Sequence, residues 1–523
     1  MANHRKTDTS GRGDAGKRHG ENGRRGAGAG RRQGDHRGHA ARFGKPSRAG
    51  SSQRSRVQPS GKRRNTPQTG SSAQPAPAAP LSNKARKAAA GPCPLMHACG
   101  GCSWIGMPYR KQLARKQQMV EELFGPVIAE FGWGIAPDAV LGMRMLDAPG
   151  ANGDGADTAG DVSASPALAS DPLRTATVTI ADGKLAAPRG FRHKAATPFA
   201  PGPEGTVRDG FYARGTHDII EVPACPVEAP GARQILNDVA RLAGKLDIPA
   251  YDEDRGQGML RYAVLRLGWR RPEGMLTLVT ARRNVPELDE LARQLAAAHP
   301  QLTCIAQNIN GRPGNAILGH ETRPLWGSAC MRDELLGCTF EISPTAFYQT
   351  NPQQTEVLYR LAIEGMGLRS GDVLMDAYCG SGTIGITAVH AARAAGRDVR
   401  LLGVERNPAG IADARRNAEL NGLAGSCEFV AEDATSYLRR AANTGAHVDV
   451  LVMDPPRAGS TPEFLAAAAA MGPRRIVYVS CNPTTLARDL ADLGRAGYRL
   501  VRLIPVDMFP HTDHIEMVAV LER

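Results

Sequence analysis

Residues 373–383 read Val-Leu-Met-Asp-Ala-Tyr-Cys-Gly-Ser-Gly-Thr, and this stretch decides the fold. Its opening apolar run is typical of a short buried strand, and the two glycines allow a tight turn into a following helix. From here to the C-terminus, strand and helix patterns alternate regularly. Such alternation predicts an α/β fold, a Rossmann-like doubly wound sheet with a mostly parallel core.

The expected elements of this sheet can be read from the apolar periodicity. Strands are expected at 373–376, 400–404, 427–430, 448–453, 475–479, 499–506 and 516–521, and helices at 383–395, 408–421, 433–442, 462–470 and 484–495. In such sheets ligands bind at the carboxyl ends of the strands. The glycine loop, residues 376–383, occupies that position after the first strand, so we expect a ligand beside it.

Acidic residues stand at successive strand ends of the same sheet. Glu405 ends the second strand, roughly 20 residues after the glycine loop, where a carboxylate can bind ribose hydroxyls. Asp433 follows the third strand, where an acid can meet an adenine amino group. The glycines do not follow the G-x-G-x-x-G spacing that NAD-binding loops use. The pattern therefore favours S-adenosylmethionine as the ligand and a methyltransferase as the protein.

Cys481 follows the fifth strand, in Ser-Cys-Asn-Pro, and we expect the helix that begins after it to favour the thiolate. A thiolate that adds to C6 of a pyrimidine makes C5 nucleophilic, and a separate base must then remove the C5 proton. From the residues alone, Glu516, His511 and His514 are comparable candidates for that base. Asp-Pro-Pro-Arg, residues 454–457, also occurs in amino-group methyltransferases, which need no cysteine.

A second group of cysteines precedes this region. Cys93, Cys99 and Cys102 follow a C-x5-C-x2-C spacing, and Cys225 lies far downstream in Ala-Cys-Pro-Val. Four cysteines can hold zinc or an iron–sulfur cluster, and the spacing alone leaves both open. Ten cysteines in 523 residues do not form a disulfide framework, so a reducing, cytoplasmic setting fits best.

The net charge of +13 is unevenly distributed. Residues 1–90 hold 21 Lys and Arg against 4 Asp and Glu, a net +17, whereas the remaining 44 basic and 48 acidic residues give −4. The first segment is rich in Gly, Arg, Ser and Pro and has one aromatic residue, Phe43. We expect it to be a disordered basic tail that adds sequence-blind affinity for RNA. No apolar run is long enough for a membrane span.

The chain is expected to divide into five parts. Residues 1–90 form the basic tail, 91–146 the cysteine segment, 147–174 a low-complexity insertion, 175–345 a central α+β domain that contacts RNA, and 346–523 the methyltransferase domain. The cysteine segment is expected to contain a helix at 108–124. In the central domain we expect strands at 175–180 and 219–222, a helix at 232–246, and a hairpin of strands 263–267 and 275–280. Residues 191–194 and the hairpin arginines Arg270 and Arg271 are candidate phosphate contacts.

Four motifs stand in order within residues 345–523: the glycine loop, Asp-Pro-Pro-Arg, Ser-Cys-Asn-Pro, and His-Ile-Glu at 514–516. With these motifs, the region resembles the RNA 5-methyluridine methyltransferase family, which uses S-adenosylmethionine. The resemblance implies that Cys481 forms the covalent adduct and that Glu516 is the base. It also adds Gln349, Tyr378 and Asp454 to Glu405 and Asp433 as donor contacts.

The cysteine grouping resembles that of the family's iron–sulfur members, which act on 23S rRNA. This implies that Cys93, Cys99, Cys102 and Cys225 hold a [4Fe-4S] cluster and that the partner is a single-stranded loop of 23S rRNA with its target uridine flipped out. No obligate protein partner is evident. Many such members carry a β-barrel before the cysteines, and residues 1–90 show no strand pattern for one. The alternatives are a tRNA uracil-5 methyltransferase, an amino-group methyltransferase and a non-catalytic RNA-binding protein.

Overall fold

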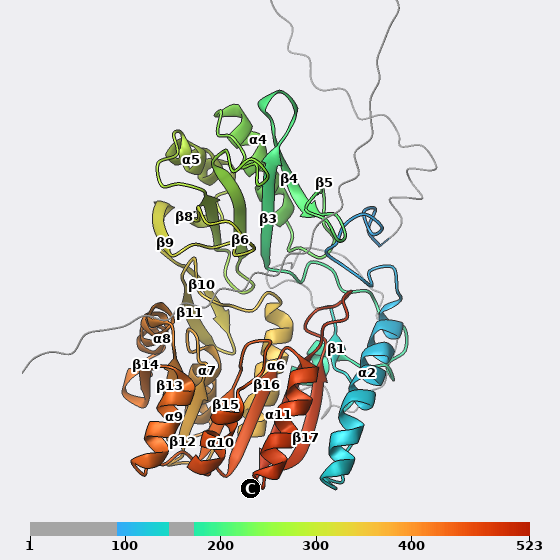
Figure 1. The fold of residues 1–523 in the computed structure, drawn as a ribbon, viewed down its shortest axis with the longest axis vertical. Coiled ribbons are helices and arrows are strands. Elements are labelled where there is room, and N and C mark those ends of the chain that lie inside the picture. The colour runs from blue at the N-terminus through green and yellow to red at the C-terminus, as the bar shows by residue number, and fades with distance from the viewer. Residues whose placement is uncertain (1–91, 146–171) are drawn as a thin grey trace, which may run out of the picture. The chain divides into compact units, whose positions relative to one another are not determined.

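Two seven-stranded sheets organise the protein in the computed structural model, which describes residues 92–145 and 172–523 (Figure 1). The expected basic tail and nearly all of the expected insertion lie outside these ranges. One sheet belongs to the C-terminal part of the chain and carries the sequence motifs. The other belongs to the central part.

The C-terminal sheet has the order β14-β13-β12-β15-β16-β18-β17. All neighbouring strands run parallel except β18, which is antiparallel to both β16 and β17. The chain order reverses between β12 and β15, so this point is the topological switch at which ligands bind. The strands are β12 (Val373–Ala377), β13 (Arg400–Glu405), β14 (Cys427–Ala431), β15 (Val450–Met453), β16 (Arg475–Ser480), β17 (Arg499–Val506) and β18 (Glu516–Glu522).

Helices cover both faces of this sheet, because alternate strand residues enter two different apolar cores. In β15, for example, Val450 and Val452 pack on one side while Leu451 and Met453 pack on the other. The first core receives α6 (Pro352–Met366), α7 (Thr383–Ala394) and α8 (Pro408–Leu420), and the second receives α9 (Ala434–Asn443), α10 (Pro462–Met471) and α11 (Pro483–Arg495). The predicted doubly wound fold is confirmed, and its element boundaries lie within two residues of those expected.

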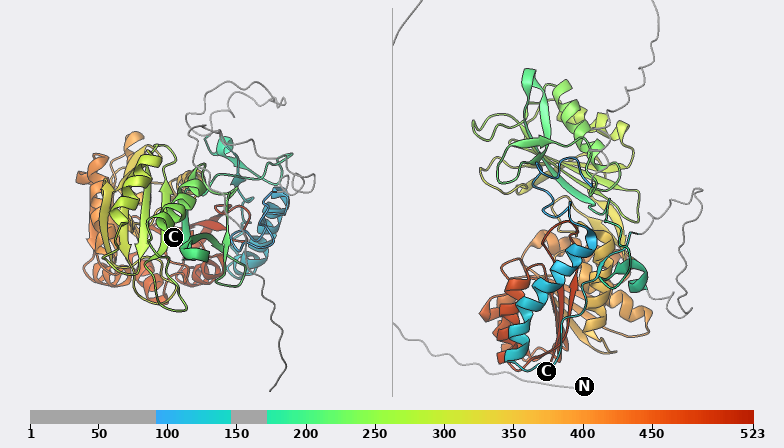
Figure 2. Two further views of the ribbon diagram at one scale, coloured as in Figure 1. Left: turned by 90° about the horizontal axis from the view of Figure 1, so that it is seen from above. Right: turned by 90° about the vertical axis from the view of Figure 1, so that its right-hand side faces the viewer.

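A helix of the cysteine segment, α2 (Tyr109–Glu130), joins the second core and packs against α11 (Figure 2, right). It is six residues longer at its C-terminal end than expected. The chain after it runs along β17, where the Asp138 amide donates to Leu503 and the Leu141 amide to Pro505. The cysteine segment thus covers one edge of the methyltransferase sheet, and an edge that is covered cannot pair with another chain.

The central sheet has the order β5-β4-β3-β6-β7-β8-β9, with α4 (Ala232–Lys245) and α5 (Leu288–Ala298) packed on one face. The β7–β8 pair is parallel, and the other pairs are antiparallel. The expected α+β character, helix and hairpin are all present. The strands are β3 (Lys194–Pro201), β4 (Val207–Tyr212), β5 (Ile219–Glu221), β6 (Leu260–Leu267), β7 (Gly274–Thr280), β8 (Leu302–Ile309) and β9 (Glu321–Gly327).

The prediction of a strand at residues 175–180 is largely wrong. Residues Pro172–Ala176 form the short helix α3, and only Thr177–Val178 form a strand, β2, which pairs with β1 (Gly142–Met143). A further hairpin, β10 (Met331–Leu335) with β11 (Cys338–Ile342), was not expected. Its apolar side chains join the core under α7 and α8, so it is part of the methyltransferase domain. Within the described ranges, no helix is long and apolar enough to cross a membrane.

Candidate active site

The loop between β12 and α7 has the backbone of a ligand-binding turn. Gly380 and Gly382 have φ values of 55° and 82°, in the left-handed region that favours glycine. Tyr378, directly before them, has φ 65°, which is strained for an aromatic residue. Its ring rests against Phe464, with centroids 5.2 Å apart. Such strain persists only where the surroundings enforce it, and it concentrates at ligand sites.

Carboxylates gather around this loop without cations to neutralise them. Asp376 is buried and accepts a hydrogen bond from the Gly385 amide at 2.9 Å. Burial, together with the charges of Asp454 and Glu405, raises its pKa to about 8, although the hydrogen bond from Gly385 acts in the opposite direction. Burial also raises the pKa of Asp454 to about 7. None of these three acids makes an ion pair with another described residue, so this edge of the sheet is suited to a cationic ligand.

The other expected donor residues are less closely gathered. Glu405 ends β13 and accepts from the Asn407 amide at 2.7 Å. Asp433 is the N-cap of α9 and accepts from the Ser436 amide at 3.0 Å, so a structural role accounts for it as well. Gln349 lies in the segment before α6 and lines a small cavity with Arg266 and Tyr348. Within residues 92–145 and 172–523, no hydrogen bond joins Gln349 to the glycine loop.

The register of the sheet places Cys481 opposite Glu516. Ser480, the last residue of β16, pairs with Met517 near the start of β18. Cys481 directly follows the first, and Glu516 directly precedes the second, so the two face each other across an antiparallel pair. They lie at the same edge as Asp454, which follows β15. The expected nucleophile and base are therefore brought together at the edge of the sheet where the parallel strands end.

The electrostatics of this pair differ from our expectation. Burial raises the pKa of the Cys481 thiol to about 11, and Glu516 and Asp454 add to this, while Arg457 opposes it. The α11 N-terminus was expected to favour the thiolate, but these effects outweigh it. Glu516 is only 2% exposed, and burial together with Asp454 holds its pKa well above its usual range. The raised pKa values favour the protonated forms of both the Cys481 thiol and the Glu516 carboxyl.

A cavity of about 310 Å³ opens beside Cys481. One wall is apolar and comes from α2, with Met119, Val120 and Leu123. The opposite wall is polar and comes from the loops after β15 and β16 and before β18, with Arg457, Asn482, Thr484, Asp513 and His514. An apolar wall with a few polar groups is the usual lining of a pocket for a flat organic ligand.

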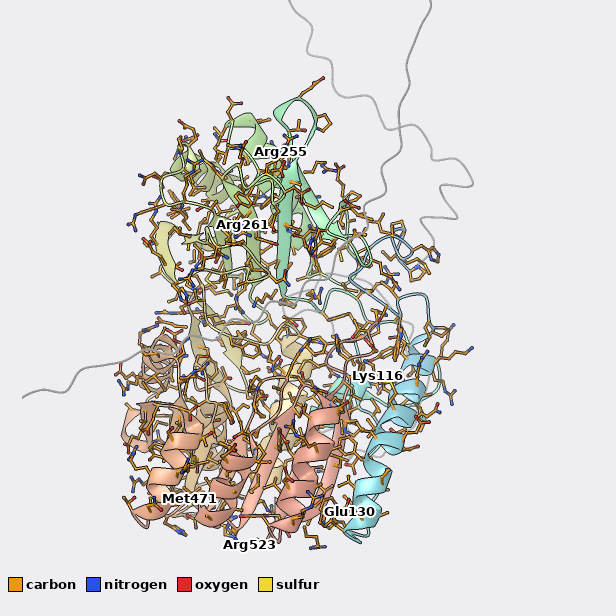
Figure 3. All side chains as sticks on the ribbon, in the orientation of Figure 1. Lys116, Glu130, Arg255, Arg261, Met471 and Arg523 are labelled. Carbon is orange, nitrogen blue, oxygen red and sulfur yellow. The ribbon has the colours of Figure 1, made fainter. Side chains whose placement is uncertain are left out.

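The loop before Glu516 is held by α2. The Lys116 ammonium, labelled in Figure 3, is fully buried and donates to Asp507 Oδ1 at 2.6 Å, to the Phe509 carbonyl at 3.2 Å and to the His514 carbonyl at 2.6 Å. The Tyr109 hydroxyl donates to the other Asp507 oxygen at 2.8 Å. One lysine thus uses all three of its N–H groups to join the two ends of the loop before Glu516.

His511 is excluded as the base by its contacts. Its Nδ1 lies 3.1 Å from Gln112 Nε2, and its Nε2 lies 2.8 Å from the Pro188 carbonyl. Burial lowers its pKa. The backbone is held too, because the Trp104 amide donates to the His511 carbonyl at 2.8 Å. His511 therefore fastens the cysteine segment to the loop, whereas His514 lines the Cys481 cavity.

Sequence reasoning missed two groups at this site. The Tyr359 hydroxyl on α6 lies 3.0 Å from Thr383 Oγ1, and burial and the charge of Asp454 raise its pKa. Nothing in its local pattern singled it out. Lys116 did leave a signal, because it falls on the apolar stripe that includes Tyr109, Leu113 and Val120. A lysine on a buried stripe predicts a buried anionic partner.

The four cysteines of the predicted cluster line one cavity. Burial raises the pKa of Cys102 to about 12, while Arg192 lowers it and the thiols of Cys225, Cys99 and Cys93 raise it. The Gly101 amide donates to Cys99 Sγ at 3.3 Å. The grouping of all four is as expected. However, within residues 92–145 and 172–523 no three His, Cys, Asp or Glu side chains are arranged to hold a metal ion.

The two hairpin arginines are less available to RNA than expected. Arg270 makes a bidentate contact with Glu356, at 2.7 and 2.8 Å. Arg271 contacts Glu334 at 3.1 Å and Glu273 at 3.4 Å. Both guanidinium groups therefore have carboxylate partners within the protein.

The sheet order and the ligand loop at its switch point define a methyltransferase fold. The solved structure of the Pyrococcus abyssi tRNA (uracil-54, C5)-methyltransferase in complex with S-adenosyl-L-homocysteine has the same fold, with a TM-score of 0.58 and 24% identity over 80% of this chain and 85% of that one. The family model for tRNA (uracil-5-)-methyltransferase matches residues 336–523.

Sequence relatives extend the likeness over most of the chain. An uncharacterized RNA methyltransferase of Halalkalibacterium halodurans is 36% identical over 431 residues, 82% of this chain and 83% of the relative. Another, from Oceanobacillus iheyensis, is 39% identical over 335 residues, 64% of this chain and 71% of the relative. The chain belongs to the RNA (uracil-5-)-methyltransferase family and is an S-adenosylmethionine-dependent RNA methyltransferase.

Replacing Lys116 with methionine should leave the Asp507 carboxylate buried and unpaired. Breaking a buried ion pair by removing one partner costs about 3–5 kcal/mol. We expect a fall of that size in the free energy of unfolding, measured by urea denaturation. The double variant Lys116→Met/Asp507→Leu should recover much of it. Lys111→Met, on the exposed face of the same helix, is the control and should change stability by less than about 0.5 kcal/mol. A neutral Lys116→Met would contradict the account of the loop.

Alkylation of Cys481 by iodoacetamide should report its raised pKa. The thiolate is the reactive form, so the rate at this residue, followed by peptide mass spectrometry, should keep rising with pH up to about 11. Arg457→Gln removes a nearby cation and should slow the reaction at pH 9, whereas Glu516→Gln removes an acid and should speed it. A rate that levels off below pH 9 would show that the thiol is not held in its protonated form.

Proposed function

We propose that this protein transfers a methyl group from S-adenosylmethionine to C5 of a uridine in 23S rRNA, with Cys481 as the nucleophile and Glu516 as the base. The observation that carries this proposal is the register of β16 and β18, which sets the two residues opposite each other. An amino-group methyltransferase would need no thiol at this position, and a non-catalytic RNA-binding protein would need neither residue.

The donor contacts are proposed to come from the acidic edge of the sheet. Bound S-adenosylmethionine supplies a methyl group on a positively charged sulfur. Its positive charge would favour the ionised forms of the buried Asp376 and Asp454, whose pKa values are raised in the free protein. Glu405 lies at the same edge, and the strained backbone at Tyr378 and the two glycines allow close approach of an adenosine. Asp433 and Gln349 complete the proposed set.

The chemistry assigns one bond change to each catalytic residue. The thiolate of Cys481 adds to C6 of the uracil, which makes an enolate with a nucleophilic C5. Bound S-adenosylmethionine would supply the methyl carbon: as the bond to C5 forms, the carbon–sulfur bond would break and its electron pair would stay on sulfur, which leaves neutral S-adenosylhomocysteine. The carboxylate of Glu516 then accepts the proton from C5, and the bond between Cys481 Sγ and C6 breaks as the C5–C6 double bond re-forms. The uridine must be flipped out of any stack to reach the cavity beside Cys481.

The four-cysteine cavity supports 23S rRNA rather than tRNA as the substrate, because that grouping is a feature of the family's ribosomal members. Its donor set fits a [4Fe-4S] cluster: four thiols, an apolar surround of Ile105, Phe191 and Val227, and a backbone amide directed at one sulfur. Such a cluster would tie residues 93–102 to Cys225 of the central part. All ten cysteines are free, which suits a reducing cytoplasm.

Trapping of the covalent intermediate tests the nucleophile and the base together. RNA in which the target carries 5-fluorouridine should remain attached to Cys481, because fluorine cannot leave C5 as a cation. Glu516→Gln should accumulate an adduct on ordinary RNA, because no carboxylate is then present to accept the C5 proton. Cys481→Ala should form neither adduct and lose methyl transfer, while S-adenosylmethionine binding, measured by calorimetry, stays within about twofold. Methylation by Cys481→Ala near the parent rate would exclude this mechanism.

Anaerobic purification tests the cluster. We expect iron and acid-labile sulfide near four each per chain, the stoichiometry of this cluster type. Cys225→Ser removes one ligand and should lose the cluster, whereas Cys330→Ser, outside the grouping, should keep it. Stoichiometric zinc without sulfide would overturn the assignment.

A further inference from the structure

The charges along α2 are arranged against the helix dipole. Its first ten residues, 109–118, hold four basic residues and no acid, and its last twelve, 119–130, hold three acids and no basic residue. The dipole favours the opposite order, with acids at the N-terminus and bases at the C-terminus. Helix stability therefore does not account for this pattern, and some other interaction must favour it.

Three of the four basic residues are exposed and lack carboxylate partners. Lys116 is buried and paired with Asp507, as described above. Arg110, Lys111 and Arg115 lie on the exposed surface, and none forms an ion pair with any residue in 92–145 or 172–523. This contrasts with most exposed arginines of the central sheet, such as Arg270 and Arg271, which do have such partners.

The exposed charges form a ridge that leads to the catalytic cavity. Lys111, Arg115 and Met119 are spaced four residues apart and so lie one above another along the helix, over about 12 Å. Met119 is 37% exposed and lines the cavity beside Cys481. In the middle of the row, the Arg115 guanidinium lies 5.1 Å from the centre of the half-buried Trp104 ring, and the Lys116 ammonium lies 5.9 Å from it.

We propose that this ridge, defined by Trp104, Lys111, Arg115 and Met119, binds the single-stranded RNA that flanks the uridine in the catalytic cavity. Lys111 and Arg115 contact successive phosphates, and Trp104 offers a face on which a base can stack, as in other sites for single strands. Beyond Met119, Glu121 and Glu122 repel phosphate and limit the track. The proposal rests on the proposed function, since it takes RNA as the substrate.

Salt dependence of binding tests the ridge without requiring chemistry. The probe is a fluorescein-labelled single-stranded oligouridine, and the variant is Lys111→Gln/Arg115→Gln. The matched control is Arg241→Gln/Lys245→Gln, which removes two exposed charges with the same four-residue spacing from α4. Loss of two phosphate contacts should reduce the slope of log affinity against log salt by about 1.4. The control should leave the slope unchanged.

Three further results complete the test. Both double variants should melt within about 2 °C of the parent, because the replaced side chains are exposed. The KM for unmodified 23S rRNA should rise in the ridge variant and stay at the parent value in the control, because only the ridge variant loses contacts to the RNA backbone. An unchanged slope, or equal changes in variant and control, would overturn the ridge. Absence of a Cys481 adduct in the parent would instead overturn the proposed function, and a selective change of slope would still support the ridge.

Discussion

The buried ion pair between Lys116 and Asp507 holds the catalytic edge of the sheet in place. Asp507 directly follows strand β17 and begins the loop before Glu516, and the same ammonium group binds the carbonyl of His514 at the far end of that loop. Because the pair is fully buried, its geometry is sharply defined and costly to break. The lysine belongs to α2, so the cysteine segment and the methyltransferase sheet cannot move independently at this point.

That constraint connects the cysteine segment to the loop before Glu516 by direct contacts. Trp104, two residues after Cys102, also contacts the loop through the His511 carbonyl. The segment therefore reaches the loop from both its cysteine end and its helix.

The buried acids around Cys481 explain why the free protein keeps its thiol protonated, since each anion nearby makes a further negative charge less favourable.

The C-terminal domain was predictable because its inner strands β12, β15, β16 and β18 are buried on both faces and read as apolar runs between turn residues. The antiparallel insertion of β18 could not be read from Glu516–Glu522, yet it is what sets Glu516 opposite Cys481. In the central domain, strands β3 and β4 were not predicted. They contain proline or glycine, which weakens the local strand pattern, and their pairing depends on strands far away in the sequence. The raised pKa of Cys481 also depends on burial and on residues far away in sequence, so the local motif suggested the opposite direction.

The central claim is that this fold methylates C5 of a uridine in 23S rRNA. Mass spectrometric mapping of 5-methyluridine in ribosomal and transfer RNA, from a strain with and without the gene, tests it most directly. The account predicts that at least one 5-methyluridine disappears from 23S rRNA and returns when the parent gene, but not the Cys481→Ala gene, is restored. An unchanged 23S rRNA, with the loss of 5-methyluridine confined to tRNA, would contradict it.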